Sequence, residues 1–284
     1  MTSNIYKIQD TRSQASYSQY RVASSGQGKR IVIASAKGGA GCTTIAANLA
    51  WLLSHQFDSR VACADLDFVS GDLDLHFNIT ASNRLTEMLE YPERLEPIVF
   101  ERSGVKAAEK LHVFTGYSQQ LAQEFWPDSV SFEATSLFCQ QQTDYLIWDL
   151  PSFCLRDSVG FEAMRSADIR IVIVEPTLAS IRHTNQLLTQ LVTDHDQQTM
   201  LILNYTKPEK VSLISLADVN HALGQMVDLV MPFSPEKMLS SATLGCQVAD
   251  DNSRLGWAFK QLAARIAGKS IDRRRGLRHW FRRG

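Results

Sequence analysis

The segment Lys37-Gly38-Gly39-Ala40-Gly41-Cys42-Thr43-Thr44 joins two apolar stretches of different character. Before it stands the aliphatic run Arg30-Ile31-Val32-Ile33-Ala34-Ser35, which is typical of a buried strand. After it stands Ile45-Ala46-Ala47-Asn48-Leu49-Ala50-Trp51-Leu52-Leu53, which is typical of a helix. Glycines let the main chain bend closely around an anion, and the free N–H groups at a helix N-terminus attract it. The segment therefore predicts a phosphate-binding loop that takes a nucleoside triphosphate.

This loop lacks one charge that such loops usually carry. The common pattern ends Gly-Lys-Ser/Thr, and here Cys42 stands at the lysine position. A charge-assisted hydrogen bond of that kind contributes about 1.5–3 kcal/mol, so we expect hydrolysis to be weakened by about ten- to a hundredfold while binding persists. Lys37 is the natural substitute cation, and Thr43 supplies the hydroxyl that completes a Mg²⁺ shell. In an alternative interpretation, Cys42 is a redox-sensitive thiol whose pKa falls at a helix N-terminus.

Size and composition limit the class of protein. With 284 residues, of which 44% are hydrophobic, the chain can bury the core of one large α/β domain. A formal net charge of −1 argues against a surface that binds nucleic acid all over. The five cysteines include no Cys-x-x-Cys pair, so we expect reduced thiols rather than a zinc site. No apolar segment of about 18 residues and no secretory leader occurs, so we expect a cytoplasmic location without a membrane span.

Strand-like and helix-like segments alternate over residues 30–268, which we expect to form one domain. Residues 1–29 are rich in Ser, Gln and Tyr and predict a flexible N-terminal lead-in. Continuous aliphatic strands separated by helices predict a mostly parallel sheet with helices on both faces, an α/β fold in which ligands bind at the carboxyl ends of the strands. The expected strands after the first are 61–64, 111–114, 145–148, 169–174, 200–203 and 227–231, and the expected helices include 179–193, 212–223 and 253–267.

Carboxylates follow two of the expected strands. Asp65 and Asp67 end the second strand, and because side chains alternate along a strand, both can point toward the phosphate loop. We expect Asp67 to polarise or position the attacking water and Asp149 to hold a Mg²⁺ water. Asp65 is either a further carboxylate of the magnesium site or a cap of its own loop. Asp72 and Asp74 are expected as solvated turn and helix-start residues.

With these residues in place, the chain resembles the MinD/ParA branch of P-loop ATPases, whose deviant Walker A loop reads Lys-Gly-Gly-x-Gly-Lys-Thr-Ser/Thr. The resemblance extends over about residues 30–268 and implies ATP and Mg²⁺ as ligands. It implies that Lys37 contacts the phosphates held by the other subunit of an ATP-linked homodimer, that Asp67 activates water, and that Asp149 serves the magnesium shell. The nucleotide contacts that it implies are Lys37, Gly38, Gly39, Ala40, Gly41, Cys42, Thr43, Thr44, the adenine-reading Asn204 and, lining the base, Pro232.

Within that branch, the chain resembles most the TadZ/CpaE pilus-assembly proteins. The shared features are Gly41-Cys42-Thr43-Thr44, the acidic segment 65–74, Asp149-Leu150-Pro151 and the segment 174–180. The resemblance implies a protein that localises Tad-type, type IV-related pilus secretion machinery and hydrolyses ATP weakly or not at all. Many members carry a receiver-like N-terminal domain, for which residues 1–29 are too short.

The segment 269–284 is a basic, amphipathic tail. Its last twelve residues include six arginines and no acid. Leu277, Trp280 and Phe281 are spaced i, i+3 and i+4, so a short helix would present an apolar edge flanked by positive charge to the inner face of the membrane. Two tails in an ATP-linked dimer would bind such a surface cooperatively. The alternative is a solvated basic tail.

Other functions stay open at this point. A partition-class ATPase would bind nonspecific DNA through the tail arginines, a partner that we consider less favoured than the membrane. A MinD-like ATPase would occupy the membrane or a cell pole in the same way as the pilus protein. A relative of the nitrogenase iron protein would need a pair of cluster cysteines across a dimer, and Cys139 and Cys154 are not placed convincingly for it.

Overall fold

The computed structural model describes residues 27–116, 125–191 and 196–269. Within these residues one sheet of eight strands runs in the order β3-β4-β2-β5-β1-β6-β7-β8. Every neighbouring pair is parallel except β3 with β4. The strands are β1 (Lys29–Ala34), β2 (Val61–Asp65), β3 (Val105–Ala108), β4 (Leu111–Phe114), β5 (Tyr145–Asp149), β6 (Ile169–Val174), β7 (Gln198–Asn204) and β8 (Leu229–Met231).

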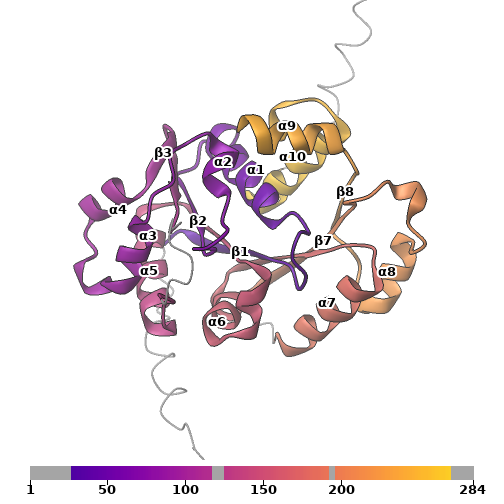
Figure 1. Ribbon diagram of the computed structural model, residues 1–284, viewed down its shortest axis with the longest axis horizontal. Helices are drawn as coiled ribbons and strands as arrows, with labels where there is room; N and C mark the ends of the chain where they lie inside the picture. Colours follow the sequence, from indigo (N-terminus) through magenta and orange to yellow (C-terminus); the bar gives the residue numbers. More distant parts are fainter. Residues whose placement is uncertain (1–26, 117–124, 192–195, 270–284) are drawn as a thin grey trace, which may run out of the picture.

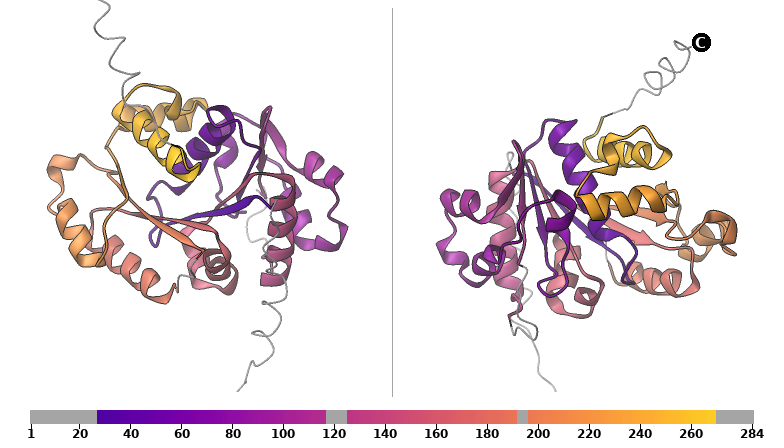
Figure 2. Two further views of the ribbon diagram at one scale, coloured as in Figure 1. Left: turned by 180° about the vertical axis from the view of Figure 1, so that it is seen from behind. Right: turned by 45° about the horizontal axis from the view of Figure 1, so that its top comes forward.

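Helices cover both faces of this sheet (Figure 1). One face is covered by α1 (Cys42–His55), α2 (Leu73–Phe77), α9 (Pro235–Leu244) and α10 (Arg254–Ile266). The other face is covered by α3 (Arg84–Glu90), α4 (Pro97–Ser103), α5 (Ser129–Gln142), α6 (Ser158–Ser166), α7 (Leu178–Gln190) and α8 (Leu216–Leu223). Short 3-10 helices are η2 (Pro92–Arg94), η3 (Ser152–Arg156), η4 (Glu209–Val211) and η5 (Val248–Asp250). The same layers are seen from behind and from above in Figure 2.

The central strand β1 shows why the fold is layered in this way. It lies between β5 and β6, and alternate side chains enter different cores. Ile31 and Ile33 pack under α1 and α10, whereas Val32 and Ala34 pack on the α5 and α6 side. A strand that is apolar at every position must be buried on both faces. The predicted α/β sheet with helices on both faces is therefore confirmed.

The elements differ from the sequence prediction mainly at the edges. The sequence analysis did not predict β3, because Val-Lys-Ala-Ala is short and half-exposed at the edge of the sheet. The helix expected from residue 212 begins only at Leu216, because Ser215 caps it and forms a reciprocal capping box with Asp218. None of the helices in the described ranges is long and apolar enough to cross a lipid bilayer. The lead-in up to residue 26 and the tail residues Leu277, Trp280 and Phe281 lie outside the described residues.

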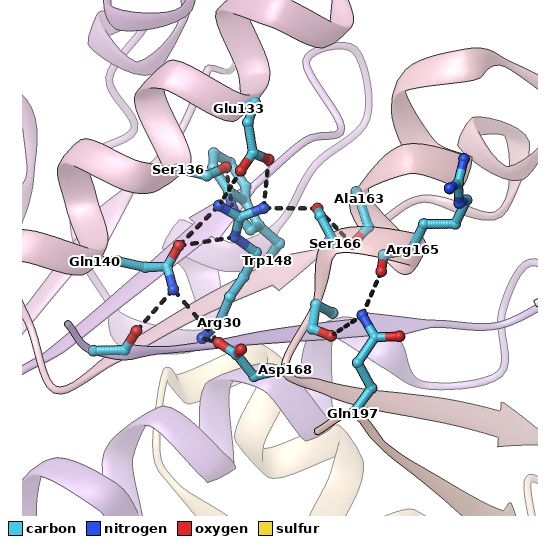
Figure 3. A network of polar contacts seen from close by, with 12 residues as sticks. Arg30, Glu133, Ser136, Gln140, Trp148, Ala163, Arg165, Ser166, Asp168 and Gln197 are labelled. Atoms are coloured by element: carbon cyan, nitrogen blue, oxygen red, sulfur yellow. Dashed lines mark hydrogen bonds and ion pairs between the residues drawn. The ribbon is translucent and has the colours of Figure 1, made fainter. Parts of the chain in front are cut away.

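A buried arginine anchors the amino-terminal end of β1 (Figure 3). The Arg30 side chain is 2% exposed, and its guanidinium donates to both carboxylate oxygens of Glu133, at 2.6 and 3.1 Å. The same group donates to Gln140 Oε1 and to the Ser166 hydroxyl, while the Arg30 main-chain N–H donates to Asp168 Oδ2 at 2.7 Å. These contacts join β1 to α5, α6 and the start of β6. They lie at the amino-terminal end of β1, and the glycine-rich loop follows its carboxyl end.

We expect Arg30→Ala to lower the free energy of unfolding by about 3 kcal/mol, because it leaves the Glu133 carboxylate and Gln140 without their charged partner. Urea unfolding followed by circular dichroism measures this change. Arg165→Ala removes an exposed arginine that pairs with Glu162 and is the matched control, with a cost of at most about 1 kcal/mol. Equal costs for both variants would contradict an anchoring role for Arg30.

Candidate functional site

The glycine-rich loop lies at the carboxyl end of the central strand, where neighbouring strands connect in opposite directions. Gly39 and Gly41 adopt left-handed φ angles of 78° and 93°, which side-chain-bearing residues rarely tolerate. Gly41 is the N-cap of α1, no side chain caps the helix, and its first turn contains no acidic residue. The N–H groups and the positive end of the α1 dipole are therefore available to an anion in the loop.

Asn204 supports the loop from behind. It ends β7, and its amide nitrogen donates to the Ala40 carbonyl at 2.7 Å. A Cβ atom on Gly41 would lie 2.8 Å from the same nitrogen, so only glycine fits at that position. Pro232 follows Met231, which is in register with Asn204 on the adjacent strand, so the two predicted base contacts share one corner of the sheet. The adenine contact of Asn204 stays a prediction.

Two carboxylates lie side by side beside the loop, since Asp65 on β2 is in register with Asp149 on β5. Burial and the charges of Asp72 and Asp67 raise the pKa of Asp149 to about 7, although a hydrogen bond from Thr43 opposes the shift. Burial and the charge of Asp149 also raise the pKa of Asp65 well above its usual value. The site therefore disfavours two ionised carboxylates in the absence of a cation, and a bound cation would favour their charged forms.

The donor set fits a magnesium ion that arrives with a nucleotide. Asp149 Oδ1 is buried and has no hydrogen-bond partner among the described residues, and the Thr43 hydroxyl lies beside this carboxyl group. Within the described ranges, no three His, Cys, Asp or Glu side chains are grouped so that they could hold a metal ion. A hard cation held here would thus take the Thr43 hydroxyl, Asp149 through a water, and phosphate oxygens as ligands. Bound in this way, Mg²⁺ would neutralise charge between two phosphates.

Asp65 and Asp67 organise the turn that follows β2. Asp65 Oδ1 accepts the Asp67 N–H at 2.8 Å, and Asp65 Oδ2 accepts the Leu73 N–H at 3.4 Å. Asp67 accepts the Ser70 N–H and hydroxyl, each at 2.8 Å. These bonds support the interpretation of Asp65 as a loop cap, while its role as a metal ligand stays a prediction. The role of Asp67 in positioning a water stays a prediction.

The structure contradicts one smaller expectation from the sequence and does not support one alternative interpretation. Asp74 is not solvated, because it is 8% exposed in α2, and burial raises its pKa. Burial and the nearby Asp149 raise the pKa of the Cys42 thiol well above its usual value, so the helix N-terminus does not activate it. Cys42 is therefore a neutral thiol, and it leaves the loop without the cation that a lysine would supply.

Lys37 lies at the start of the loop and is paired within the chain. Its ammonium group contacts Glu175 Oε2 at 2.9 Å, and Glu175 follows directly after β6. The Thr206 hydroxyl, just after β7, donates to the other carboxylate oxygen of Glu175. The sequence analysis did not single out Glu175 as a site residue. The sequence feature that could have identified Glu175 is its place as an acidic residue directly after a buried strand, at the strand's carboxyl end.

These features define a P-loop nucleotide-binding α/β domain, and comparisons with known proteins agree. The model of the CobQ/CobB/MinD/ParA nucleotide-binding domain matches residues 31–236. A putative septum site-determining protein MinD of Guillardia theta is 28% identical over 251 residues, which cover 85% of this chain and 89% of the relative. The chain therefore belongs to the CobQ/CobB/MinD/ParA family of nucleotide-binding domains.

Solved structures share the fold at lower identity. A ParA family ATPase from Chlorobium tepidum TLS superposes with a TM-score of 0.75 at 23% identity, over 85% of this chain and 100% of that one. MinD from Pyrococcus horikoshii OT3, solved in complex with Mg-ADP, gives a TM-score of 0.66 at 19% identity, over 84% and 95% of the two chains. Both likenesses support the layered sheet described above.

The raised pKa of Asp149 predicts a stability that depends on pH. The folded state holds the extra proton between the unfolded and folded pKa values, so its stability falls as the pH rises from about 4 to about 7. Asparagine cannot ionise, so the Asp149→Asn variant should not show this loss. The free energy of unfolding of the variant minus that of the parent should therefore be larger at pH 8 than at pH 5, by on the order of 2 kcal/mol. Urea unfolding without nucleotide at both pH values measures the difference.

Asp196→Asn is the matched control, because Asp196 is exposed. We expect it to leave the difference in stability between pH 5 and pH 8 unchanged. An Asp149→Asn variant with the same pH dependence as the parent would contradict a buried, uncompensated carboxyl group at this position.

Proposed function

We propose that this protein binds Mg-ATP in the loop 37–44, dimerises when ATP is bound, and hydrolyses ATP weakly or not at all. The observation that carries the proposal is the uncapped N-terminus of α1 behind two left-handed glycines, with a neutral thiol at the lysine position. Backbone N–H groups suffice to hold the phosphates, whereas the missing cation weakens the transition state for transfer. Membership of the family and the Mg-ADP held by the Pyrococcus MinD support nucleotide binding.

Exposed apolar side chains support contact with a second copy of the chain. Phe153, Leu178 and Leu213 follow β5, β6 and β7, and they are 48%, 77% and 98% exposed. Phe153 and Leu178 each lie four residues beyond the carboxyl end of a parallel strand, and Leu213 lies further along, in the connection between β7 and α8. Large apolar side chains that stay exposed in the connections after these strands favour a contact with another protein surface. A dimer formed over the carboxyl ends of the strands would enclose both nucleotides.

We propose that the dimer positions Tad-type pilus machinery at the inner membrane face or a cell pole. The support is the resemblance of the loop, the acidic segment 65–74 and the segment 174–180 to the TadZ/CpaE proteins. In a host that assembles such pili, deletion should remove the pili, and restoring the full chain should return them. A deletion strain with normal pili would contradict this part of the proposal.

A DNA-partition function is the second candidate, favoured by the six arginines of residues 273–284. The two candidates are separated by binding of the full chain to anionic liposomes and to nonspecific duplex DNA with Mg-ATP. Salt-sensitive retention on DNA favours partition, and binding to liposomes without DNA binding favours the membrane. Removal of residues 270–284 tests whether Leu277, Trp280 and Phe281 carry the liposome binding.

We expect Lys37→Ala to bind ATP but to lose ATP-dependent dimerisation. Each of the two lysines in a symmetric dimer would contribute about 1.5–3 kcal/mol through a charge-assisted bond to phosphate, so the dimer should weaken by more than about a hundredfold. Sedimentation velocity with and without Mg-ATP measures the dimer, and a fluorescent ATP analogue measures binding. Lys207→Ala, an exposed lysine after β7, is the matched control. Dimerisation of Lys37→Ala equal to that of the parent would contradict the cross-subunit contact.

We expect Cys42→Lys to raise the rate of ATP hydrolysis by about ten- to a hundredfold, because it restores a cation beside the phosphates. The new ammonium group would also lie near Asp149, whose charge now raises the pKa of Cys42. Phosphate release under saturating Mg-ATP measures the rate. Cys246→Lys makes the same exchange at an exposed cysteine and should leave it unchanged. An unchanged rate in Cys42→Lys would mean that something other than the missing cation limits hydrolysis.

A further inference from the structure

The Lys37–Glu175 ion pair is built into the corner where three strands end. Lys37 follows β1, Glu175 follows β6, and Thr206 follows β7. The Lys37 side chain is 44% exposed, whereas that of Glu175 is only 7% exposed. The pair thus joins a cation that solvent can reach to a carboxylate that is fixed in the protein.

Glu175 is held by contacts on both sides. Its Oε1 accepts the Thr206 hydroxyl, and its main-chain N–H donates to the Ser180 hydroxyl at 2.9 Å. Ser180 lies in the first turn of α7, whose N-cap Thr177 accepts the Ser180 N–H. The Thr206 hydroxyl therefore orients the carboxylate and Ser180 fixes the main chain that carries it, whereas Lys37 is the more exposed member of the pair.

One ammonium group cannot be held by Glu175 and also reach the phosphates of a second protomer. We propose that Glu175, oriented by Thr206, is a positioning residue that holds Lys37 within its own chain until dimerisation draws it away. This inference rests on the proposed ATP-dependent dimer, in which a nucleotide of the second copy competes with Glu175 for Lys37. The monomer in which Lys37 is paired with Glu175 is then the more populated state. Only the monomers in which this ion pair has opened can dimerise.

The ion pair with Glu175 should lower the chemical reactivity of Lys37 even when no nucleotide is bound. A lysine in an ion pair reacts more slowly with an acylating reagent than a free lysine does. In the nucleotide-free full chain, Glu175→Gln should therefore raise the acetylation rate of Lys37 by about two- to fivefold, the range expected for a partly exposed pair. Mass spectrometry of the peptide that contains Lys37 measures the rate with sulfo-N-hydroxysuccinimidyl acetate. Thr206→Val should raise it by a smaller factor, because the carboxylate stays but loses its orientation.

Glu209→Gln is the matched control, since it removes the same charge from an exposed residue at the start of η4, three residues after Thr206. We expect this variant to leave the acetylation of Lys37 at the parent rate. Thermal unfolding of each variant establishes that the fold is retained. Equal Lys37 acetylation rates in the parent and in Glu175→Gln would overturn the proposed hold, whether or not the protein binds ATP.

The second measurement is the Mg-ATP concentration at half-maximal dimerisation. We expect Glu175→Gln to lower it by about two- to fivefold relative to the parent and to Glu209→Gln. Unchanged binding of a fluorescent ATP analogue would assign the gain to dimerisation rather than to nucleotide affinity. A Glu175→Gln variant that needs as much ATP as the parent, or more, would overturn the inference while leaving the dimer in place. Absence of a dimer in the parent and in all variants would instead contradict the proposed function. The acetylation rates would then still show whether Glu175 holds Lys37 within the chain.

Discussion

The structure depends on the burial of β1 on both faces and on the anchoring of its amino-terminal end by Arg30. Its aliphatic side chains enter two cores that α1 and α10 close on one side and α5 and α6 on the other. The Arg30 network fixes the amino-terminal end of the strand, and the glycine-rich loop leaves from the carboxyl end. Because the strand cannot shift without exposing one core or separating Arg30 from Glu133, the loop and the N-terminus of α1 start from a fixed position.

The balance of charge at the site follows from that position. Asp65 and Asp149 are brought together by strand register, and burial keeps their pKa values raised. Cys42 adds no positive charge. Lys37, the lysine of the same loop, is paired with Glu175. A site with buried carboxylates and a committed lysine suits a ligand that brings its own cation, as Mg-ATP does.

The same arrangement separates binding from turnover. Main-chain N–H groups at a helix end hold phosphate without side-chain charge, so the substitution at Cys42 leaves this part of the site intact. Transfer of a phosphoryl group needs positive charge where negative charge develops. In the proposed function, the nucleotide-bound state would therefore matter more than the rate of hydrolysis.

The sequence by itself determined the layered α/β fold, the place of the loop between a strand and a helix, and the carboxylates at the ends of two strands. These follow from local patterns, because apolar runs, glycines and strand-end acids each act over a few residues. Only the tertiary structure decided that Asp65 pairs with Asp149, that Arg30 is buried in a polar network, and that Lys37 is held by Glu175. Each of these contacts joins residues more than 80 positions apart, and no local pattern encodes which strand lies next to which. The edge strand β3 was missed for a related reason, since its pairing with β4 rather than its own composition makes it a strand.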